Sequence, residues 1–483
     1  MTNYLDLELK TINELLKSKK IKPIDLVNEA FFKIEKNNLN TYITLNKEGA
    51  IKKAKELENK EVDNLLFGIP IAIKDNIVTK GLRTTTASKI LENFEPTYDA
   101  TVVTKLKEKN MIIVGKANLD EFAMGSTGET SYFKPTLNPC DKTKVPGGSS
   151  SGSAATVAAR EVLLSLGSDT GGSVRQPAAF CGVVGMKPTY GRVSRYGLIA
   201  YASSLDQIGV ISKNVYENAC FLEILSGKDD SDLTSFEKEA DYTSKINNDI
   251  TNLKVAVPNF YLSDAVTDEV KDSLKNVISL LEEDGINIEY VDIKHLNYAV
   301  CLYQTIALAE ASSNFARFDG VRYGYIASKF DSLDEMYKNT RTEGFGAEVK
   351  RRIMIGSYVL SGENAHIYYE KALKVRKELT NNLKRVLSEY DLIIGPTSAT
   401  VAYDLDSSNL NNLTSFTDDL LTIPANMAGI PAMSMPMGIN KDNLPIGLQI
   451  MSDSYNEDLV YNFGHKLEQK LNLTKKIEGD LDV

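Results

Sequence analysis

The stretch VPGGSSSGSAATVAAREVLLSLGSDTGGSVRQP, residues 145–177, decides the fold. Two Gly-Gly-Ser triplets, at 147–149 and 171–173, enclose a good helix former at 153–159 and an apolar run at 162–166. Flexible linkers do not alternate with packed elements in this way, so we interpret the triplets as parts of a structured site. Each triplet offers a hydroxyl and unobstructed backbone N–H groups, which suits the binding of an anion or oxyanion.

Outward from this stretch, short apolar runs alternate with amphipathic segments. Residues 68–73 read as a buried strand that ends at Lys74, and residues 98–109 and 111–115 as a helix and a further strand. Later strands are expected at 253–257, 286–291, 431–437 and 444–451, and a final helix at 459–471. This alternation predicts an α/β fold with crossover connections.

The domain organisation follows from where the pattern changes. Residues 1–60 show helical apolar stripes and are expected to form an N-terminal helical segment that packs on the core. Residues 61–483 are expected to form one large domain, with a mostly helical insertion at about 230–390. No internal repeat is visible.

The composition is that of an ordinary globular protein rather than of a nucleic-acid-binding module. The 483 residues are 42% hydrophobic and 25% charged, and the net charge of −10 argues against strong nucleic-acid binding by this chain alone. The sequence has no apolar leader and no long apolar run, so we expect a cytoplasmic protein without a membrane segment. The four cysteines and three histidines lack metal-ligand spacing, and no P-loop is present, so we expect no metal and no cofactor on this chain.

Three serines of the triplet region, Ser149, Ser150 and Ser173, are candidate nucleophiles that need a base. Residues 148–152 match G-x-S-x-G, but a Ser-His-Asp triad would have to recruit His366 or His465 from helical surfaces. Residues 131–134 match the S-x-x-K motif of penicillin-recognising enzymes, but its companion motifs are absent. Both alternatives are therefore disfavoured.

A lysine is the base that remains. Lys74 ends a buried strand, where desolvation lowers the pKa of the amine and allows it to accept a proton near neutral pH. Ser149 could relay a proton between Lys74 and Ser173, while the backbone N–H groups of Thr170, Gly171 and Gly172 form an oxyanion hole. The alternative for Lys74 is an ordinary lysine at the surface end of a strand.

Lys74 and the segments 147–155 and 167–178 together resemble the amidase signature family. The resemblance implies a large mixed β-sheet covered by helices on both faces, and amide hydrolysis by a Ser-cisSer-Lys triad. In this sequence the triad would be Ser173 as nucleophile, Ser149 as the cis-peptide serine and Lys74 as base.

A second group of segments, at 120–126, 309–314, 317–320, 350–354 and 421–426, resembles the glutaminase subunits of bacterial Asp/Glu-tRNA amidotransferases. This resemblance implies a three-subunit enzyme that converts Glu-tRNA(Gln) to Gln-tRNA(Gln). The present chain would release ammonia from glutamine, the B subunit would use ATP and magnesium and handle most of the tRNA, and the C subunit would wrap around both. One departure is Ser151, where the family is expected to carry glycine. The alternatives are a stand-alone amidase of a small-molecule amide and, less favoured because the triad residues are intact, an inactive scaffold.

A glutamine pocket needs a cation for the α-carboxylate and an anion for the α-ammonium. By position in the matching segments we expect Arg352 to bind the carboxylate, Asp419 the ammonium, and Tyr303 to form the pocket wall. Met124 and Gly125 are expected to supply backbone contacts. Arg351 and Asp418 are the neighbouring alternatives, and an exposed salt bridge is the plain alternative for each charged residue.

Overall fold

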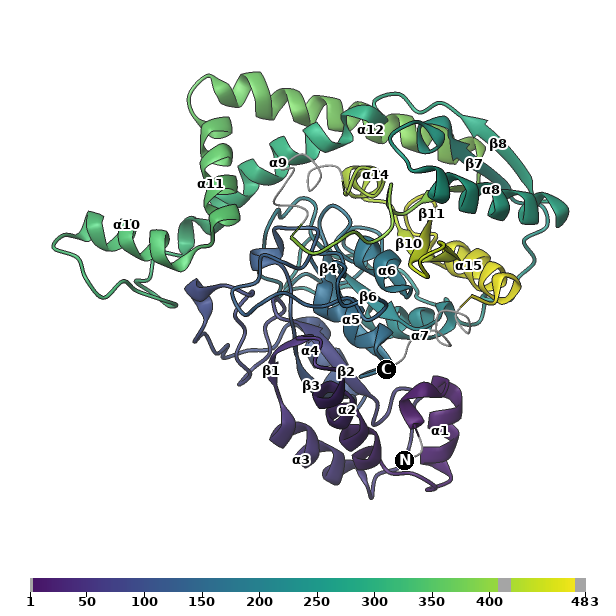
Figure 1. Cartoon of the computed structure of the whole chain (residues 1–483), viewed down its shortest axis with the longest axis horizontal. Coiled ribbons are helices and arrows are strands. Elements are labelled where there is room, and N and C mark those ends of the chain that lie inside the picture. Colours follow the sequence, from purple (N-terminus) through teal and green to yellow (C-terminus); the bar gives the residue numbers. More distant parts are fainter. Residues whose placement is uncertain (1–2, 407–417, 474–483) are drawn as a thin grey trace.

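An 11-stranded mixed sheet runs through the middle of the molecule (Figure 1). The computed structural model describes residues 3–406 and 418–473. Across the sheet the strands follow the order β1-β3-β2-β4-β6-β5-β10-β11-β9-β7-β8. Their bounds are β1 Tyr42–Leu45, β2 Pro70–Lys74, β3 Ile112–Ala117, β4 Leu164–Asp169, β5 Val184–Lys187, β6 Gln207–Ser212, β7 Lys254–Pro258, β8 Asn287–Val291, β9 Leu392–Pro396, β10 Ala432–Ile439 and β11 Pro445–Met451.

Two parallel blocks lie in this sheet, and antiparallel strands join them. β2 runs parallel to both β3 and β4, and β7 runs parallel to both β8 and β9. Every residue of β2, β3 and β4 is buried, as expected for strands with helices on both faces of the sheet. The predicted α/β fold is therefore confirmed.

The helices cover the sheet and extend beyond it. Their bounds are α1 Leu9–Lys17, α2 Pro23–Asn37, α3 Lys47–Leu57, α4 Thr101–Glu108, α5 Ser151–Ala158, α6 Arg175–Cys181, α7 Val215–Leu225, α8 Asp268–Glu283, α9 Ala299–Asn314, α10 Leu333–Gly344, α11 Ala347–Leu360, α12 Glu370–Glu389, α14 Ile423–Ala428 and α15 Glu457–Leu471.

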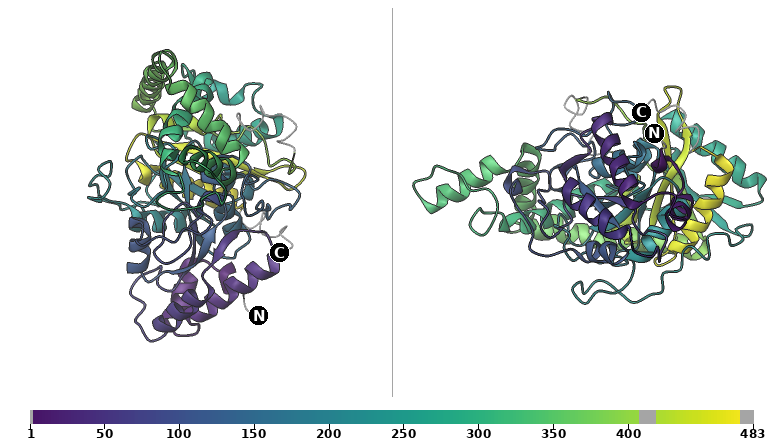
Figure 2. Two further views of the ribbon diagram at one scale, coloured as in Figure 1. Left: turned by 90° about the vertical axis from the view of Figure 1, so that its left-hand side faces the viewer. Right: turned by 90° about the horizontal axis from the view of Figure 1, so that it is seen from below.

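The long helices α9, α11 and α12 form one end of the molecule, opposite α1, α2 and α3 (Figure 1). α9 packs on α11 and α12, and α12 also packs on α14. α10 projects from the body as an arm in both Figure 1 and Figure 2. Within this end, α9 reaches the second Gly-Gly-Ser triplet, because the Tyr303 ring of α9 lies beside Gly171 in the turn that follows β4.

Small residues let α5 lie directly on the sheet. All eight residues of α5 are buried. A β-carbon on Gly152 would lie 2.4 Å from the Thr41 carbonyl oxygen and 2.5 Å from the Asn118 nitrogen, so only glycine fits there. The Gly-Ser-Ala composition of this segment is therefore a packing requirement, and the flexible-linker interpretation is wrong.

Some local expectations need correction. Residues 1–60 are not wholly helical, because β1 lies within them and pairs antiparallel with the edge of β3. A strand of four residues is too short to show a clear alternation of apolar and polar residues, and the segments on both sides of it have a helical pattern. β6 gave no sequence signal that we used, yet it pairs with both β4 and β5. β7 and β8 lie inside the range 230–390 and extend the main sheet, so the bounds of the insertion stay a prediction.

No helix within residues 3–406 and 418–473 has the length and apolar character needed to cross a membrane.

Candidate active site

Lys74 ends β2 with its amine deep in the molecule. The Nζ atom lies 2.7 Å from Ser149 Oγ, 2.8 Å from Ser150 Oγ and 3.2 Å from the Ser168 carbonyl oxygen. The side chain is fully buried, which excludes the surface strand-end alternative. Because β2 and β4 are parallel neighbours, the end of β2 lies beside the turn that follows β4.

Burial is the main influence on the Lys74 amine. Burial lowers the pKa, the negative charges of Asp120, Asp169 and Asp206 oppose this in part, and the resulting pKa of Lys74 is about 7. At neutral pH a large fraction of this amine is therefore uncharged and able to accept a proton. The three carboxylates act on the lysine through their electrostatic field, at a distance longer than a hydrogen bond.

The Ser149 loop is held by the side chain of Gln176 and by the backbone of Asp120. The Gly148 N–H donates to Gln176 Oε1 at 2.8 Å, and the Asp120 N–H donates to the Ser149 carbonyl oxygen at 3.2 Å. The peptide bond between Gly148 and Ser149 is cis. These contacts fix the backbone on both sides of the Ser149 hydroxyl.

Ser173 lies in the turn between β4 and α6. Its carbonyl oxygen accepts the Ser150 N–H at 3.1 Å, so the second triplet is tied to the first. Arg175 anchors the start of α6 through a buried ion pair with Asp169 at 2.9 Å. Ser173 itself is 4% exposed, so a substrate that reaches it is taken out of water.

The glycines of this turn are sterically required. Gly172 has φ +150°, and a β-carbon there would lie 2.2 Å from Thr422 Oγ1. A β-carbon on Gly171 would lie 2.8 Å from the Tyr303 ring. Among residues 3–406 and 418–473, no hydrogen bond engages the N–H groups of Thr170, Gly171 and Gly172, the predicted oxyanion hole, or that of Ser173. These free donors can bind a developing oxyanion.

Two of the expected glutamine-binding residues lie against this turn. The Tyr303 ring, on α9, lies beside Gly171, and Asp419 Oδ1 lies 2.8 Å from the β-carbon position of Gly172. Asp419 as a residue is partly exposed, but its Oδ1 atom is shielded from solvent and has no hydrogen-bond partner in the described part of the chain. Burial, together with the charges of Asp418 and Asp169, raises the pKa of Asp419 to about 8.

Arg352, on α11, points toward the same region. Its Nη1 atom donates to the Tyr201 hydroxyl at 3.1 Å, and its Nε atom lies 2.6 Å from Glu348 Oε1. Its charge acts on both Tyr303 and Asp419. The residue is 7% exposed, so the exposed salt bridge is not an adequate description of it.

The neighbouring alternatives have different surroundings. The Arg351 side chain is 41% exposed and pairs with Glu348 on the outer side of α11. Asp418 accepts hydrogen bonds from Ser126 Oγ at 2.8 Å and from the Tyr403 hydroxyl at 2.7 Å. These contacts favour Arg352 and Asp419 over their neighbours as the groups that face the turn between β4 and α6, which carries Ser173 (the nucleophile turn).

Met124 and Gly125 lie in the loop that follows the short helical turn Glu121–Ala123. Met124 is buried, and a β-carbon on Gly125 would lie 2.4 Å from Asp120 Cγ. The next residue, Ser126, accepts the Gln176 side-chain amide through its carbonyl oxygen at 3.1 Å. The loop is therefore connected to the nucleophile region, and a direct contact of Met124 or Gly125 with substrate stays a prediction.

Sequence reasoning missed two residues that the structure brings to the site, Thr422 and Tyr201, and gave Ser150 only as a candidate nucleophile. The Lys74 amine donates a hydrogen bond to Ser150 Oγ as well as to Ser149 Oγ. Thr422 donates to the Gly171 carbonyl oxygen at 2.6 Å, and Tyr201 contacts Arg352. Ser150 stood in the quoted motif, whereas Thr422 and Tyr201 meet the site only through the fold.

The other candidate motifs do not reach this place. His366 lies on the surface beside Glu370, and His465 contacts Gln469 on α15. Ser131 donates to Asn118 Oδ1 at 2.7 Å rather than joining a lysine. Within the described ranges, no group of three or more His, Cys, Asp or Glu side chains is arranged to hold a metal ion.

Comparison with known proteins agrees with this geometry. The family model described as Amidase matches residues 25–461. The chain is similar to the A subunit of glutamyl-tRNA(Gln) amidotransferase from Listeria welshimeri, at 52% identity over 476 residues, and to that from Macrococcus caseolyticus, at 50% over 474 residues; each comparison covers 98% of both chains. It is also similar to the crystal structure of the same subunit from Thermotoga maritima, with a TM-score of 0.81 and 43% identity, covering 97% of this chain and 96% of that one.

Proposed function

The chain belongs to the amidase signature family, and on this basis we propose that it is the glutaminase subunit of a glutamyl-tRNA(Gln) amidotransferase. One observation carries the choice of glutamine within the family. A buried carboxylate oxygen without a partner among the described residues, Asp419 Oδ1, lies against the nucleophile turn, within the field of Arg352. A simple amide offers nothing to that oxygen, whereas the α-ammonium of glutamine offers a charged donor.

Acylation begins with the neutral Lys74 amine. As Lys74 accepts the proton of Ser149, Ser149 Oγ accepts the proton of Ser173, and Ser173 Oγ forms a bond to the carboxamide carbon of glutamine. The electron pair of the C=O double bond moves to oxygen, and the N–H groups of Thr170, Gly171 and Gly172 bind the resulting charge. This charge exists only after attack, so these donors stabilise the transition state more than the bound substrate.

Collapse of the intermediate releases ammonia. The proton held by Lys74 returns through Ser149 to the amide nitrogen, the C–N bond breaks, and a γ-glutamyl ester on Ser173 remains. Water then gives one proton to the same relay and attacks the ester carbon, which yields glutamate and restores the Ser173 hydroxyl. The sum is glutamine plus water to glutamate plus ammonia.

Recognition of glutamine uses both ends of the amino-acid group. Arg352 binds the α-carboxylate, Asp419 binds the α-ammonium, and Tyr303 limits the depth at which the side chain enters. Met124 and Gly125 contribute backbone contacts from the facing loop. Together these residues direct the carboxamide toward Ser173.

The ammonia is used elsewhere in the assembly. We expect the B subunit to activate the tRNA-bound glutamate with ATP and magnesium, and the C subunit to bind both large subunits. The relatives are named as the A subunit of such an enzyme, which supports a multi-subunit assembly for this chain. We expect this role to be carried out in the cytoplasm.

Ammonia release tests the proposal. The chain, alone and co-expressed with candidate B and C subunits, is supplied with glutamine and with a panel of simple amides. We expect release selective for glutamine and strengthened by the partners, Glu-tRNA(Gln) and ATP. Efficient hydrolysis of unrelated amides by the lone chain, with glutamine a poor substrate, would instead establish a stand-alone amidase.

A further inference from the structure

The pairing of β4 with β6 places an aspartate opposite residues 170–173, the turn after β4 that carries the predicted oxyanion hole and Ser173; we call it the oxyanion turn. The antiparallel register pairs Asp169 with Gln207, so the next residue of one strand, Thr170, faces the residue before the other, Asp206. The Thr170 hydroxyl donates to Asp206 Oδ1 at 2.6 Å. Asp206 is 3% exposed, and the contact is therefore shielded from water.

The other carboxylate oxygen of Asp206 holds a different segment. Oδ2 accepts the N–H groups of Tyr201 at 2.8 Å and of Ala202 at 3.0 Å. The Tyr201 hydroxyl in turn accepts Arg352 Nη1, and its side chain interacts with Tyr303. One carboxylate therefore connects the oxyanion turn to two residues that we assign to glutamine recognition.

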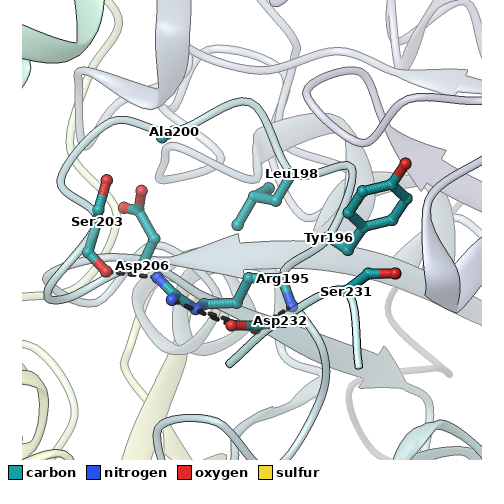
Figure 3. A pocket seen from close by; sticks show the side chains of 8 residues that line it. All are labelled: Arg195, Tyr196, Leu198, Ala200, Ser203, Asp206, Ser231 and Asp232. Atoms are coloured by element: carbon teal, nitrogen blue, oxygen red, sulfur yellow. Dashed lines mark hydrogen bonds and ion pairs between the residues drawn. The ribbon is translucent and has the colours of Figure 1, made fainter. Parts of the chain in front are cut away.

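Asp206 also lines a pocket of about 180 Å³, shown in Figure 3. A second aspartate, Asp232, lines the same pocket but binds a different segment. It accepts the backbone N–H of Arg195 at 2.8 Å and forms an ion pair with the Arg195 guanidinium. Its other hydrogen bonds are with Asp229, Thr234 and Ser235, in its own loop. The pocket thus contains one aspartate that binds the oxyanion turn and one that holds a surface loop.

We propose that Asp206 is a positioning residue of the reaction, whose carboxylate fixes the oxyanion turn and the Tyr201 segment of the glutamine pocket against each other. This inference rests on the proposed glutaminase function. Misplacing the oxyanion donors by as little as about 1 Å can lower the rate roughly 100-fold. A carboxylate that accepts three short hydrogen bonds from two segments prevents such a displacement.

The charge of Asp206 gives the inference a second, independent readout. Lys74, Arg195, Tyr190 and Tyr201 are the ionisable groups on which its charge acts, or which act on it. Burial raises the pKa of Asp206 to about 6, so the group is mostly ionised at neutral pH and raises the pKa of Lys74. An Asp206→Asn variant loses that charge, so the Lys74 amine should become neutral at a lower pH than in the unaltered chain.

The test compares three variants in the complex with the B and C subunits. Asp206→Asn keeps the shape and removes the charge, Thr170→Val removes the hydroxyl and keeps the charge, and Asp232→Asn is the matched control in the same pocket. For each, kcat and KM are measured from pH 5.5 to about 9 on glutamine and on a simple amide, together with the melting temperature.

We expect Asp206→Asn and Thr170→Val to lower kcat about 10-fold with KM for glutamine changed less than about twofold. The acidic limb of kcat/KM should move to lower pH in Asp206→Asn alone, and Asp232→Asn should behave as the unaltered complex. An unchanged kcat in Asp206→Asn, an equal loss in Asp232→Asn, or a loss that follows the melting temperature without a shift of the limb would overturn the inference. If the unaltered complex cleaves the simple amide but not glutamine, the proposed function fails, and the simple-amide data still decide the role of Asp206.

Discussion

The proposed catalytic centre and the proposed glutamine pocket are assembled in opposite ways. Lys74, Ser149 and Ser173 come from the ends of neighbouring strands and from one glycine-rich stretch, all within the first 173 residues. Tyr303, Arg352 and Asp419 come from α9, α11 and the segment before α14, and reach the site from the other end of the molecule (Figure 1). The register of the strands thus positions the proposed catalytic residues, and the helices packed over them position the proposed pocket residues. Substitutions in the two groups should therefore have separate effects on kcat and on KM for glutamine.

Loss of the nucleophile should give the largest effect and should not depend on the substrate. Ser173→Ala removes the atom that forms the acyl-enzyme, so hydrolysis of glutamine and of simple amides should fall by roughly 10⁴-fold or more. Ser165→Ala is the control, because Ser165 is buried on β4 and its hydroxyl only donates to the Ser153 carbonyl oxygen. Appreciable glutaminase activity in Ser173→Ala, measured as ammonia release, would contradict the triad.

Removal of the base should come next and again affect every substrate. Lys74→Met keeps the length of the side chain and removes the proton acceptor, for which we expect a loss of about 10³-fold in kcat. Lys187→Met is a sharp control, because Lys187 is also a buried lysine with its pKa lowered to about 7, but its amine donates to the Pro188 carbonyl oxygen. An equal loss of kcat in both variants would show that any buried lysine is needed for folding rather than for proton transfer.

A substitution in the pocket should separate the two regions. Arg352→Ala removes a buried cation, so KM for glutamine should rise roughly 10- to 100-fold while the rate on a simple amide changes little. Arg351→Ala, its exposed neighbour, should leave both values near those of the unaltered chain. Equal losses on glutamine and on the simple amide in Arg352→Ala would place Arg352 outside the pocket and join the two regions into one.

The same contrast explains how much the sequence could predict. The apolar run before Lys74 and the glycines at 171 and 172 are local signals, because burial and steric fit at these positions require those residue types. Asp206 and Thr422 have no such signal, since each meets the oxyanion turn through contacts between residues 36 and 251 positions apart. β6, which positions Asp206, was also missed. Sequence motifs therefore predict the residues that would react, whereas the residues that position them can be identified only from the tertiary structure.

The pH dependence of the rate is a smaller effect, and it tests the catalytic centre separately from the pocket because the titrating group is Lys74. Lys74 acts as a base only when neutral, and with a pKa of about 7 the neutral fraction falls about tenfold per unit below that pH. The kcat/KM for a simple amide, which reports the ionisation of the free enzyme, should therefore decline on the acidic side with a midpoint near pH 7. A flat kcat/KM profile from pH 5.5 to about 8, in a protein that stays folded, would exclude Lys74 as the titrating base.

The smallest effect concerns the proton on Asp419. Burial and the charge of Asp418 raise the pKa of this carboxyl to about 8, so near pH 7 it is mostly protonated. An incoming α-ammonium favours the ionised form, so glutamine binding should release up to one proton per site, and the released fraction should decrease as the pH rises above about 8. Calorimetric titration of the Ser173→Ala complex with glutamine, in buffers of different ionisation enthalpy, measures this proton without turnover. Asp419→Asn should bind glutamine more weakly and release no proton. Unchanged proton release in Asp419→Asn would move the ammonium site to another carboxylate, of which Asp418 is the nearest in sequence.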